Sequence, residues 1–347
     1  MANAAHTPKT DLLGFIQRLP KAELHLHIEG SLEPELIFQL AQRNGITLPY
    51  PSVQALRQAY QFTDLQSFLE LYYAGASVLI TEQDFYDMTM AYLRRAREDG
   101  VVHAEIMFDP QTHTQRGVAI ETVFAGIARA LRDTHYATGM TSYLILSFLR
   151  HLSEEDAWQT LESALPLRER YHDLWLAVGL DSGEKGNPPE KFERIYARCR
   201  ELGFRLTAHA GEEGPAAYVR TALDRLHVER IDHGVRSDED AALMERLAAD
   251  QIPLTVCPLS NLKLKVVDTL DQHNLAHMLH QGLRVTVNSD DPAYFGGYIA
   301  DNYLQSALAL GLNRPELLEL ARNSFLGSFL PDDQKNLWIS KLDAMGC

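Results

Sequence analysis

Two histidines separated by a single residue, His25 and His27, have a spacing that could serve metal chemistry. Side chains alternate between the two faces of a strand, so both imidazoles would point the same way. A third histidine, His209, and an aspartate, Asp290, each end a short apolar run far downstream. Three imidazoles and one carboxylate suit Zn²⁺ and leave a position open for water, and ferrous iron accepts the same ligands. A purely structural role for the His-x-His pair is the competing interpretation.

A carboxylate follows the third histidine closely, in the segment His-Ala-Gly-Glu (209–212). Gly211 lets the chain turn, so that Glu212 can face the same cavity as the metal ligands. A carboxyl group there acts as a general acid if burial raises its pKa. The alternative is an ordinary acidic residue of a surface loop.

Two further residues could complete a catalytic site. His233, in Asp-His-Gly, could be a fourth imidazole ligand, a base that orients the attacking water, or a buried core histidine. Asp291 follows Asp290 directly, and before Pro292 both side chains can face one cavity. If Asp290 binds the metal, Asp291 is left to hydrogen-bond a substrate. A solvated acidic turn is the alternative.

We expect no metal site in the other polar segments. His273, His277 and His280 would share one helix face without an HExxH motif, which predicts a solvent-facing stripe. The segment 183–186 lacks the spacing of a phosphate-binding loop. No lysine closes the fourth apolar run, although Lys185 is near, and this favours a single metal over a lysine-bridged pair.

Eight short apolar or β-branched runs alternate with segments of helical periodicity, which predicts parallel strands joined by right-handed crossovers. The sequence therefore predicts a (β/α)₈ TIM barrel. The expected strands are 21–27, 102–108, 141–148, 175–181, 205–211, 230–234, 253–260 and 284–290. Expected helical stretches include 154–170, 189–202, 237–250 and 271–282.

The chemistry-bearing residues fall at the ends of these expected strands, where the active site of such a barrel lies. A long helical segment separates the first two strands and predicts an insertion over roughly 31–100, above the mouth of the barrel. No linker composition marks a boundary, so we expect one domain over residues 1–347.

Composition excludes several functional classes. A net charge of −15 argues against a nucleic-acid or anionic membrane surface as the main partner. The three cysteines are widely spaced, which argues against a disulfide framework. No signal peptide or membrane-spanning run is recognisable, so the expected location is the cytoplasm. The sequence leaves the oligomeric state open.

Five motifs in this order resemble the adenosine/adenine deaminase family of metal-dependent hydrolases, over most of the chain. They are HLHIEGSLEPE (25–35), HAGEEG (209–214), RIDHG (230–234), CPLSNLKL (257–264) and NSDDPAYFGGY (288–298). The resemblance implies a TIM barrel and one zinc ion held by His25, His27, His209 and Asp290.

The resemblance also implies a role in catalysis or substrate binding for each remaining residue of the site. Glu212 would give a proton to N1 of a purine, and His233 would activate or position the attacking water. Asp291 would contact N7, and a backbone amide near Gly183 would contact N3. Water would add at C6, and ammonia would leave.

One residue favours a free purine base as the substrate. Nucleoside deaminases of this family typically have the motif HxHxDG, in which the aspartate contacts the ribose. This sequence has Glu29 at that position. Its longer side chain would enter the space of a ribose. Segments 108–117, 187–192 and 293–298 are similar to the adenine deaminase branch. We therefore expect conversion of adenine to hypoxanthine and ammonia.

The alternatives are N6-substituted adenines (cytokinin-like bases), adenosine, a cyclic-amide substrate of another single-metal hydrolase, and a catalytically silent purine-binding barrel. Aromatic residues of the insertion would cap the pocket or pack in the core. They are Phe62, Phe68, Tyr72 and Tyr73.

Overall fold

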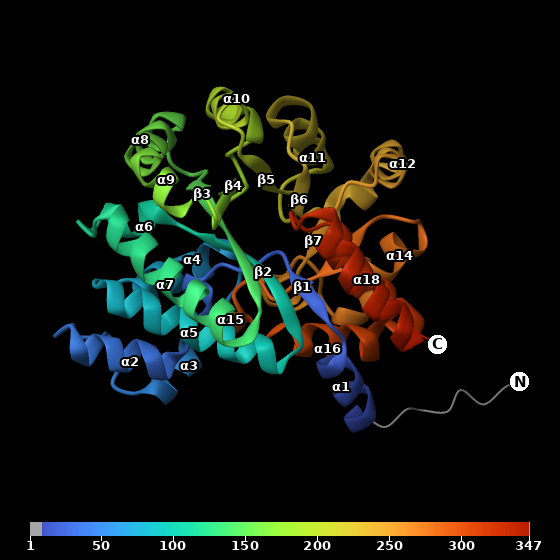
Figure 1. Ribbon diagram of the computed structural model, residues 1–347, viewed down its shortest axis with the longest axis horizontal. Helices are drawn as coiled ribbons and strands as arrows, with labels where there is room; N and C mark the ends of the chain where they lie inside the picture. Colours follow the sequence, from blue (N-terminus) through green and yellow to red (C-terminus); the bar gives the residue numbers. More distant parts are fainter. Residues whose placement is uncertain (1–8, 347) are drawn as a thin grey trace, which may run out of the picture.

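The computed structural model describes residues 9–346 of the chain. Eight parallel strands form one sheet in which each strand pairs with its neighbours in chain order (Figure 1). They are β1 (Lys21–Glu23), β2 (Val101–Phe108), β3 (Thr141–Leu149), β4 (Trp175–Asp181), β5 (Arg205–Ala210), β6 (Arg230–His233), β7 (Leu254–Val256) and β8 (Val285–Val287). Strands β2 to β4 are buried along almost their whole length, as expected where helices cover the outside and side chains fill the inside.

The sheet closes on itself between its first and last strands. Leu26 and Asp290 form a parallel bridge just beyond the ends of β1 and β8. The backbone N–H of His27 donates to the carbonyl of Asp290 at 3.0 Å, and the N–H of Asp290 donates to the carbonyl of His25 at 3.1 Å. The structure is therefore a (β/α)₈ TIM barrel, as the alternating pattern of the sequence predicts.

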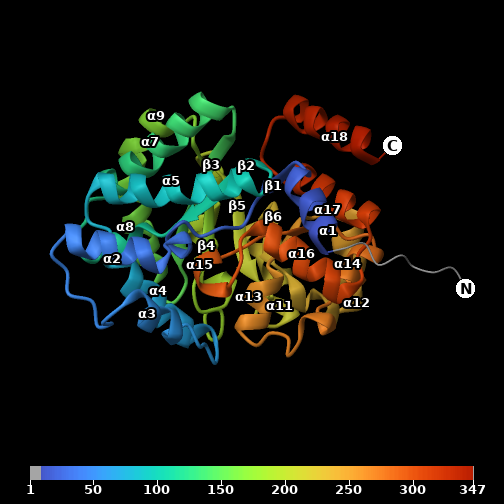
Figure 2. The same cartoon turned by 90° about the horizontal axis from the view of Figure 1, so that it is seen from below.

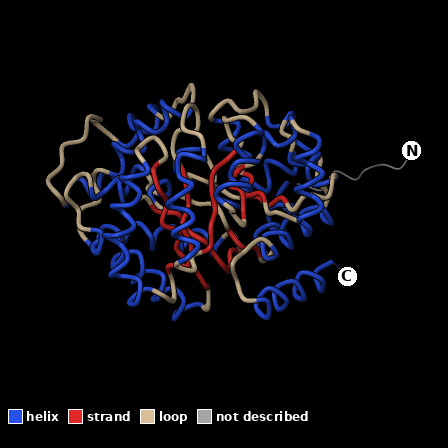
Figure 3. Tube along the Cα trace, turned by 90° about the horizontal axis from the view of Figure 1, so that it is seen from above, coloured by secondary structure: helices blue, strands red, loops and turns tan. Residues whose placement is uncertain are grey.

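Helices surround the strands on all sides, as the tube drawing in Figure 3 shows. The main crossover helices are α5 (Glu82–Glu98), α7 (Ile120–Thr138), α8 (Glu154–Ala164), α10 (Glu193–Glu201), α11 (Ala216–Thr221), α12 (Ala241–Asp250), α14 (Leu275–His280) and α17 (Arg314–Leu326). Shorter turns adjoin them at α9 (Arg168–Tyr171), η2 (Leu165–Leu167), η3 (Pro189–Phe192), η4 (Ala222–Leu226), η5 (Val235–Glu239) and η6 (Leu270–Gln272).

The predicted insertion between the first two strands is present. It contains the one-turn helix η1 (Glu29–Ser31), then α2 (Pro34–Arg43), α3 (Val53–Ala59) and α4 (Leu65–Ala76), and Figure 2 shows α2 to α4 grouped at one side of the barrel. The following helix, α5, packs along α7 as an ordinary crossover helix. The added part is therefore shorter than the predicted range.

The remaining helices flank the barrel. Short helices begin directly after strands, at α6 (Pro110–Thr114), α13 (Pro258–Lys263) and α15 (Pro292–Phe295). Helices α1 (Lys9–Arg18), α16 (Ile299–Leu310) and α18 (Asp332–Gly346) lie outside, with α18 packed against α17 at the edge of the molecule (Figure 2). None of the helices within residues 9–346 is long and apolar enough to cross a membrane.

Three strands, β1, β7 and β8, are much shorter than the sequence predicts. Pro258 occupies the first turn of α13, where a residue without an N–H fits well, so the predicted strand 253–260 ends at Val256. Beyond β8, the side chain of Asn288 accepts the N–H of Leu24 at 2.9 Å and so replaces a ladder bond between the strands. The ends of 21–27 and 284–290 are accordingly extended segments rather than continuous ladder.

The predicted stripe of solvent-facing histidines is wrong for one member. His273 lies between η6 and α14, is 4% exposed, and faces the Oδ1 atom of Asn261 through its Nε2 atom at 3.0 Å. Its Nδ1 atom accepts the N–H of Leu275 at 3.0 Å. The backbone breaks between two short helices here, and this turns His273 inward, while His277 and His280 stay exposed.

Candidate active site

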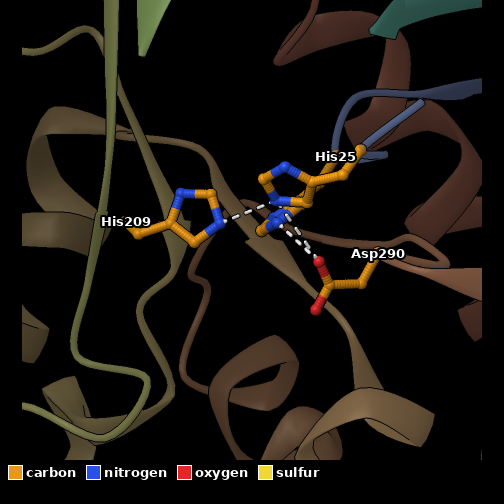
Figure 4. A group of neighbouring side chains, drawn as sticks. His25, His209 and Asp290 are labelled. Carbon is orange, nitrogen blue, oxygen red and sulfur yellow. Dashed lines mark hydrogen bonds and ion pairs between the residues drawn. The ribbon is translucent and has the colours of Figure 1, made fainter. Parts of the chain in front are cut away.

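Four ligand atoms meet at the carboxyl ends of the strands. His25 and His27 follow β1, His209 lies in β5, and Asp290 follows β8. The Nε2 atom of His25 is 3.2 Å from Oδ1 of Asp290, and the Nε2 atoms of His27 and His209 are 3.2 Å apart (Figure 4). All four side chains are buried, and their ligand atoms lie within 4.8 Å of one another. Residues more than 260 positions apart in the sequence thus form one cluster.

Each imidazole has a polar group behind it, on the side away from the cluster. The pairs are His25 Nδ1 with Thr255 Oγ1 at 3.0 Å, His27 Nδ1 with Asp181 Oδ2 at 3.5 Å, and His209 Nδ1 with Asp232 Oδ2 at 3.8 Å. An acceptor behind Nδ1 favours the tautomer with hydrogen on Nδ1, which leaves the Nε2 lone pair free to bind a metal.

This donor set fits a divalent metal ion. In the favoured tautomers, the Nε2 atoms of His27 and His209 direct lone pairs at each other across 3.2 Å, which is repulsive without a cation between them. Burial lowers the pKa of His209 well below its usual range, and the neighbouring imidazoles lower it further, so protonation does not relieve the repulsion. Three imidazoles and one carboxylate suit zinc.

Two residues placed for proton transfer lie beside the cluster. The Nε2 atom of His233 is 3.6 Å from Oε1 of Glu212 and 3.8 Å from Oδ2 of Asp290. Burial raises the pKa of Glu212 well above its usual range, with further contributions from the charges of Asp290 and Glu184. Burial lowers the pKa of His233 to about 3, helped by the positive charge on His25. Burial thus favours the protonated form of the Glu212 carboxyl and the neutral form of the His233 imidazole beside the cluster.

The backbone is strained at the cluster. Both His233 and Asp290 adopt left-handed conformations, with φ of 64° and 63°. For residues with a side chain this conformation is uncommon, and it persists where the surrounding structure imposes it. The strain turns these side chains into the barrel mouth at the point where their strands end.

Asp291 lies on the same cavity, next to the ligand Asp290. Its side chain is packed against Gly30, where an added Cβ atom would come within 1.8 Å of Oδ1 of Asp291. Burial raises the pKa of Asp291 well above its usual range, and the negative charge of Asp290 adds to this effect. The glycine in the segment after the two histidines therefore makes room for this carboxyl group.

The helix α4 covers the cavity. We call its five lining side chains the roof: Leu65, Phe68, Leu69, Tyr72 and Tyr73. The space between the atoms here is about 390 Å³, part of it open to solvent, and Phe295 and Leu264 complete its apolar wall. The N-cap Asp64 accepts the N–H of Ser67 at 2.8 Å and fixes where the helix starts. Of the four aromatic residues predicted to cap or pack, Phe68, Tyr72 and Tyr73 line the cavity, and Phe62 packs against Phe68.

Glu29 lies behind the cavity wall and does not itself line the cavity. Its carboxylate accepts the N–H of Asp109 at 3.2 Å and a hydrogen bond from Nε2 of His113 at 2.8 Å. The guanidinium of Arg116 donates to Nδ1 of His113 at 2.9 Å, which leaves the ring hydrogen on Nε2. Burial lowers the pKa of His113 to about 3, so the ring stays neutral and donates to Glu29.

The predicted Gly183 contact lies at the rim. Gly183 lines an adjoining outer pocket, which shares Ser182 and Tyr73 with the inner cavity. The hydroxyl groups of Tyr73 and Ser182 are 3.1 Å apart and form part of the wall between the two spaces. The amide region of Gly183 therefore borders the cavity from outside this wall.

Sequence reasoning missed two acids on the cavity wall. Asp109 follows β2 directly and accepts a hydrogen bond from the Tyr72 hydroxyl at 2.9 Å, and Asp181 ends β4 behind His27. Both line the cavity. The signal that could have found them is their place at strand ends, the criterion that identified the other residues.

Known proteins are similar to this chain over nearly its full length. An adenine deaminase from Paraburkholderia phytofirmans is 63% identical over 325 residues, covering 94% of this chain and 93% of that protein. An adenine deaminase from Ralstonia pickettii is 64% identical, covering 93% and 94%.

Solved structures agree in shape. The crystal structure of an adenine deaminase from Arthrobacter aurescens matches with a TM-score of 0.91 at 56% identity, covering 94% of this chain and 98% of the other. An amidohydrolase from Burkholderia ambifaria with bound zinc matches with a TM-score of 0.88 at 26% identity, covering 99% and 96%. The model of the adenosine deaminase family matches residues 20–345, and with these relatives it shows that this chain is an amidohydrolase that belongs to the adenosine deaminase family.

Proposed function

We propose that this protein catalyses the hydrolytic deamination of adenine to hypoxanthine and ammonia. The observation that carries the proposal is the convergence of Glu212, His233 and Asp291 on the four-ligand cluster beneath the roof. Relatives at 63% and 64% identity that are named adenine deaminases support the same reaction.

We propose that His25, His27, His209 and Asp290 hold one zinc ion. The donor set and the facing Nε2 lone pairs support a cation at this point, and an amidohydrolase relative carries bound zinc. Ferrous iron would fit the same donors. When bound, such a metal lowers the pKa of a coordinated water toward neutrality and polarises it for nucleophilic attack.

The chain's own residues supply the proton transfers. Burial raises the pKa of Glu212 well above its usual range, which favours its protonated form, and Glu212 would deliver that proton to N1 of the purine. Protonation at N1 makes C6 more electrophilic. His233 is neutral, so it can orient the attacking water and accept its proton. After the oxygen adds at C6, the proton held by His233 passes to N6, the C6–N6 bond breaks and ammonia leaves. The hydroxyl group left at C6 returns its proton to Glu212 as the carbonyl forms.

Orientation of the base would come from the cavity wall. Asp291, kept protonated by its high pKa, would donate a hydrogen bond to N7. The amide near Gly183 would approach N3 from the rim, and the aromatic side chains of the roof would lie against the ring.

The wall behind the base favours adenine over adenosine. Glu29 is fixed by His113 and by the Asp109 amide, and Tyr72 is fixed by Asp109. These buried hydrogen bonds would have to break to admit a sugar at this point, and leaving their polar groups unpaired is costly. Glu29 would thus select the free base by holding the wall rather than by touching the ligand.

The first test is a comparison of substrates with purified metal-loaded protein. We expect adenine to be converted efficiently, seen as the ultraviolet shift to hypoxanthine, and adenosine to be converted at least about 100-fold less efficiently, the loss expected for ~3 kcal/mol of unpaired polar groups. Efficient turnover of adenosine would contradict the role of Glu29. If N6-methyladenine is turned over faster than adenine, the proposed substrate becomes an N6-substituted adenine.

The second test separates catalysis from metal binding. Glu212→Gln keeps the shape of the side chain and removes its acidic proton, so kcat should fall about 100-fold or more. Bound zinc, measured by elemental analysis, should stay at one equivalent. Full activity in this variant, or no turnover of any purine by the metal-loaded wild-type protein, would overturn the proposal.

A further inference from the structure

The carboxylate of Glu184 receives four backbone N–H groups from one turn. Its Oε1 atom accepts from Gly211 at 2.7 Å, and its Oε2 atom accepts from Glu212 at 3.1 Å, Glu213 at 3.0 Å and Gly214 at 2.8 Å. Glu184 is 1% exposed, so water does not compete for these bonds. The turn follows β5 and carries the proposed proton donor Glu212.

Successive backbone N–H groups that point to one centre form a site for an anion, and bonds to a charged acceptor are stronger than neutral ones. Here the anion comes from the loop after β4 and binds a turn 27 to 30 residues further along the chain. Glu212 lies in the middle of the four donors. The direction of its side chain therefore depends on a carboxylate that is not part of its own loop.

The glycine spacing of the turn fits this contact. A Cβ atom on Gly214 would lie 2.6 Å from both Cδ and Oε1 of Glu184, so only glycine lets the carboxylate come this close. Gly211 has a φ of +73°, which favours glycine at the start of the turn. The segment 209–214 thus has its two glycines where the Glu184 contact needs them.

A buried arginine binds backbone carbonyl groups of the same two loops. Arg150 is fully buried; its Nη1 atom donates to the carbonyl of His209 at 2.6 Å and its Nε atom donates to the carbonyl of Asn187 at 2.9 Å. Burial lowers the pKa of Arg150, and the negative charge of Glu184 acts in the opposite direction. The cation fixes the carbonyl just before the turn, and the anion fixes the N–H groups within it.

We propose that Glu184 is a positioning residue of the deaminase: its carboxylate group holds the turn 211–214 so that Glu212 faces His233 and the metal ligands. The contact acts on the backbone of the turn. Glu184 does not line the inner cavity, so it acts through Glu212 and not on the substrate. This inference rests on the proposed role of Glu212 as proton donor.

The test uses Glu184→Gln, which keeps the size of the side chain but replaces one acceptor oxygen by an NH₂ group facing the N–H donors. We expect kcat for adenine to fall about 10- to 100-fold, as displacement of a catalytic group by about an ångström does, with KM and bound zinc nearly unchanged. Glu154→Gln is the matched control. Glu154 also accepts two backbone N–H groups, from Arg194 at 2.9 Å and Ile195 at 3.0 Å, away from the site, and its variant should keep wild-type kcat.

A double variant separates positioning from general damage. If Glu184 acts through Glu212, adding Glu184→Gln to Glu212→Gln should lower kcat no further, because the group being positioned is already disabled. A second full 10- to 100-fold loss in the double variant would overturn the proposal, as would wild-type kcat in Glu184→Gln. If Glu184→Gln fails to fold, Gly214→Ala displaces the same carboxylate while keeping its charge and should give the same kcat loss and the same non-additivity.

Hydrogen exchange tests the contact without relying on the reaction. In Glu184→Gln the amides of residues 211–214 should exchange at least about 10-fold faster, as expected when ~1.4 kcal/mol of local stabilisation is lost. Glu154→Gln should leave them protected. Unchanged protection in Glu184→Gln would overturn the proposal, whereas faster exchange in a protein that does not deaminate adenine would count against the proposed function alone.

Discussion

His25 and Asp290 are joined twice, once through the backbone and once through their side chains. The N–H of Asp290 donates to the carbonyl of His25 at 3.1 Å, and the side chains approach to 3.2 Å between Nε2 and Oδ1. The first bond closes the barrel between its first and last strands, and the second lies in the proposed metal site. The same two residues therefore close the barrel and bring two of the proposed metal ligands together.

Removal of the metal should for this reason lower the stability of the whole barrel. A ligand present at 1,000 times its Kd stabilises the folded state by about 4 kcal/mol, so chelation should lower Tm by several degrees and abolish turnover. Differential scanning fluorimetry before and after chelation, with zinc added back, measures this. Asp290→Asn should weaken zinc binding and shift Tm in the same direction. A metal-free protein, verified by elemental analysis, that keeps its Tm would contradict the link.

Gly30→Ala should lower activity through Asp291. The new Cβ atom would come within 1.8 Å of Oδ1 of Asp291, so the carboxyl group must move away from its place in the cavity. We expect kcat/KM for adenine to fall about 10-fold or more, the usual cost of losing one oriented polar contact, with zinc content unchanged. The loss should resemble that of Asp291→Asn.

The control for this substitution is Gly14→Ala on helix α1, where, among residues 9–346, the new Cβ atom would meet only the end of the Arg18 side chain at 3.3 Å. It should leave steady-state kinetics unchanged. Wild-type kcat/KM in Gly30→Ala would show that Asp291 is not needed in its observed position.

His273 should make folding stability depend on pH. Burial lowers its pKa from 6.5 to about 4, and the contacts agree, since Nδ1 accepts the Leu275 N–H and has no room for a proton. Between about pH 6.5 and 4 the unfolded chain binds a proton that the folded chain does not, so stability is present above pH 6.5 and is lost as the pH falls toward 4. At about 1.4 kcal/mol for each pKa unit, the loss from this group amounts to ~3.5 kcal/mol at most.

The measurement compares wild type with His273→Gln by urea unfolding at pH 7.5 and pH 5. The variant loses the buried contacts and should be less stable at pH 7.5, but the difference between the two proteins should shrink at pH 5. His277→Gln, on an exposed position of the neighbouring helix α14, should keep the wild-type profile. If the stability difference between wild type and His273→Gln does not change with pH, His273 is not the source of the pH dependence.

A buried ion pair that does not line the cavity should matter for stability alone. Glu105 and Arg230 are both fully buried, and Arg230 also donates to the carbonyl of Leu24 at 3.2 Å. Although burial by itself would raise the pKa of Glu105, Arg230 and His103 lower it to about 2. Glu105→Gln leaves the arginine charge buried and should cost about 3 to 5 kcal/mol of unfolding free energy, with kcat unchanged.

A double variant tests the reason for that cost. Glu105→Leu with Arg230→Met removes both charges and should recover much of the lost stability, because the penalty comes from one buried charge without its partner. Chemical denaturation of the three proteins measures this. A double variant no more stable than Glu105→Gln would point to the hydrogen bonds of Arg230, rather than its charge, as the main contribution.

The sequence by itself determined the barrel and indicated the main residues of its candidate site. Strand and helix periods are local properties, and in a parallel barrel the carboxyl ends of all strands meet at one mouth. His25, His209 and Asp290 could therefore be brought together from their places at strand ends, without any knowledge of their contacts. At Pro258 the prediction is wrong, because this proline begins a helix, whereas the expected strand 253–260 runs through it.

Only the tertiary structure decided where the other polar side chains point. Glu29 meets His113 across 84 residues, and Glu184 meets a turn across 27 to 30 residues, because packing brings these loops together. His273 turns inward because a backbone break between two short helices redirects it toward Asn261. A side chain's direction depends on which neighbours can satisfy its hydrogen bonds once water is excluded, and those neighbours are known only when the chain is folded.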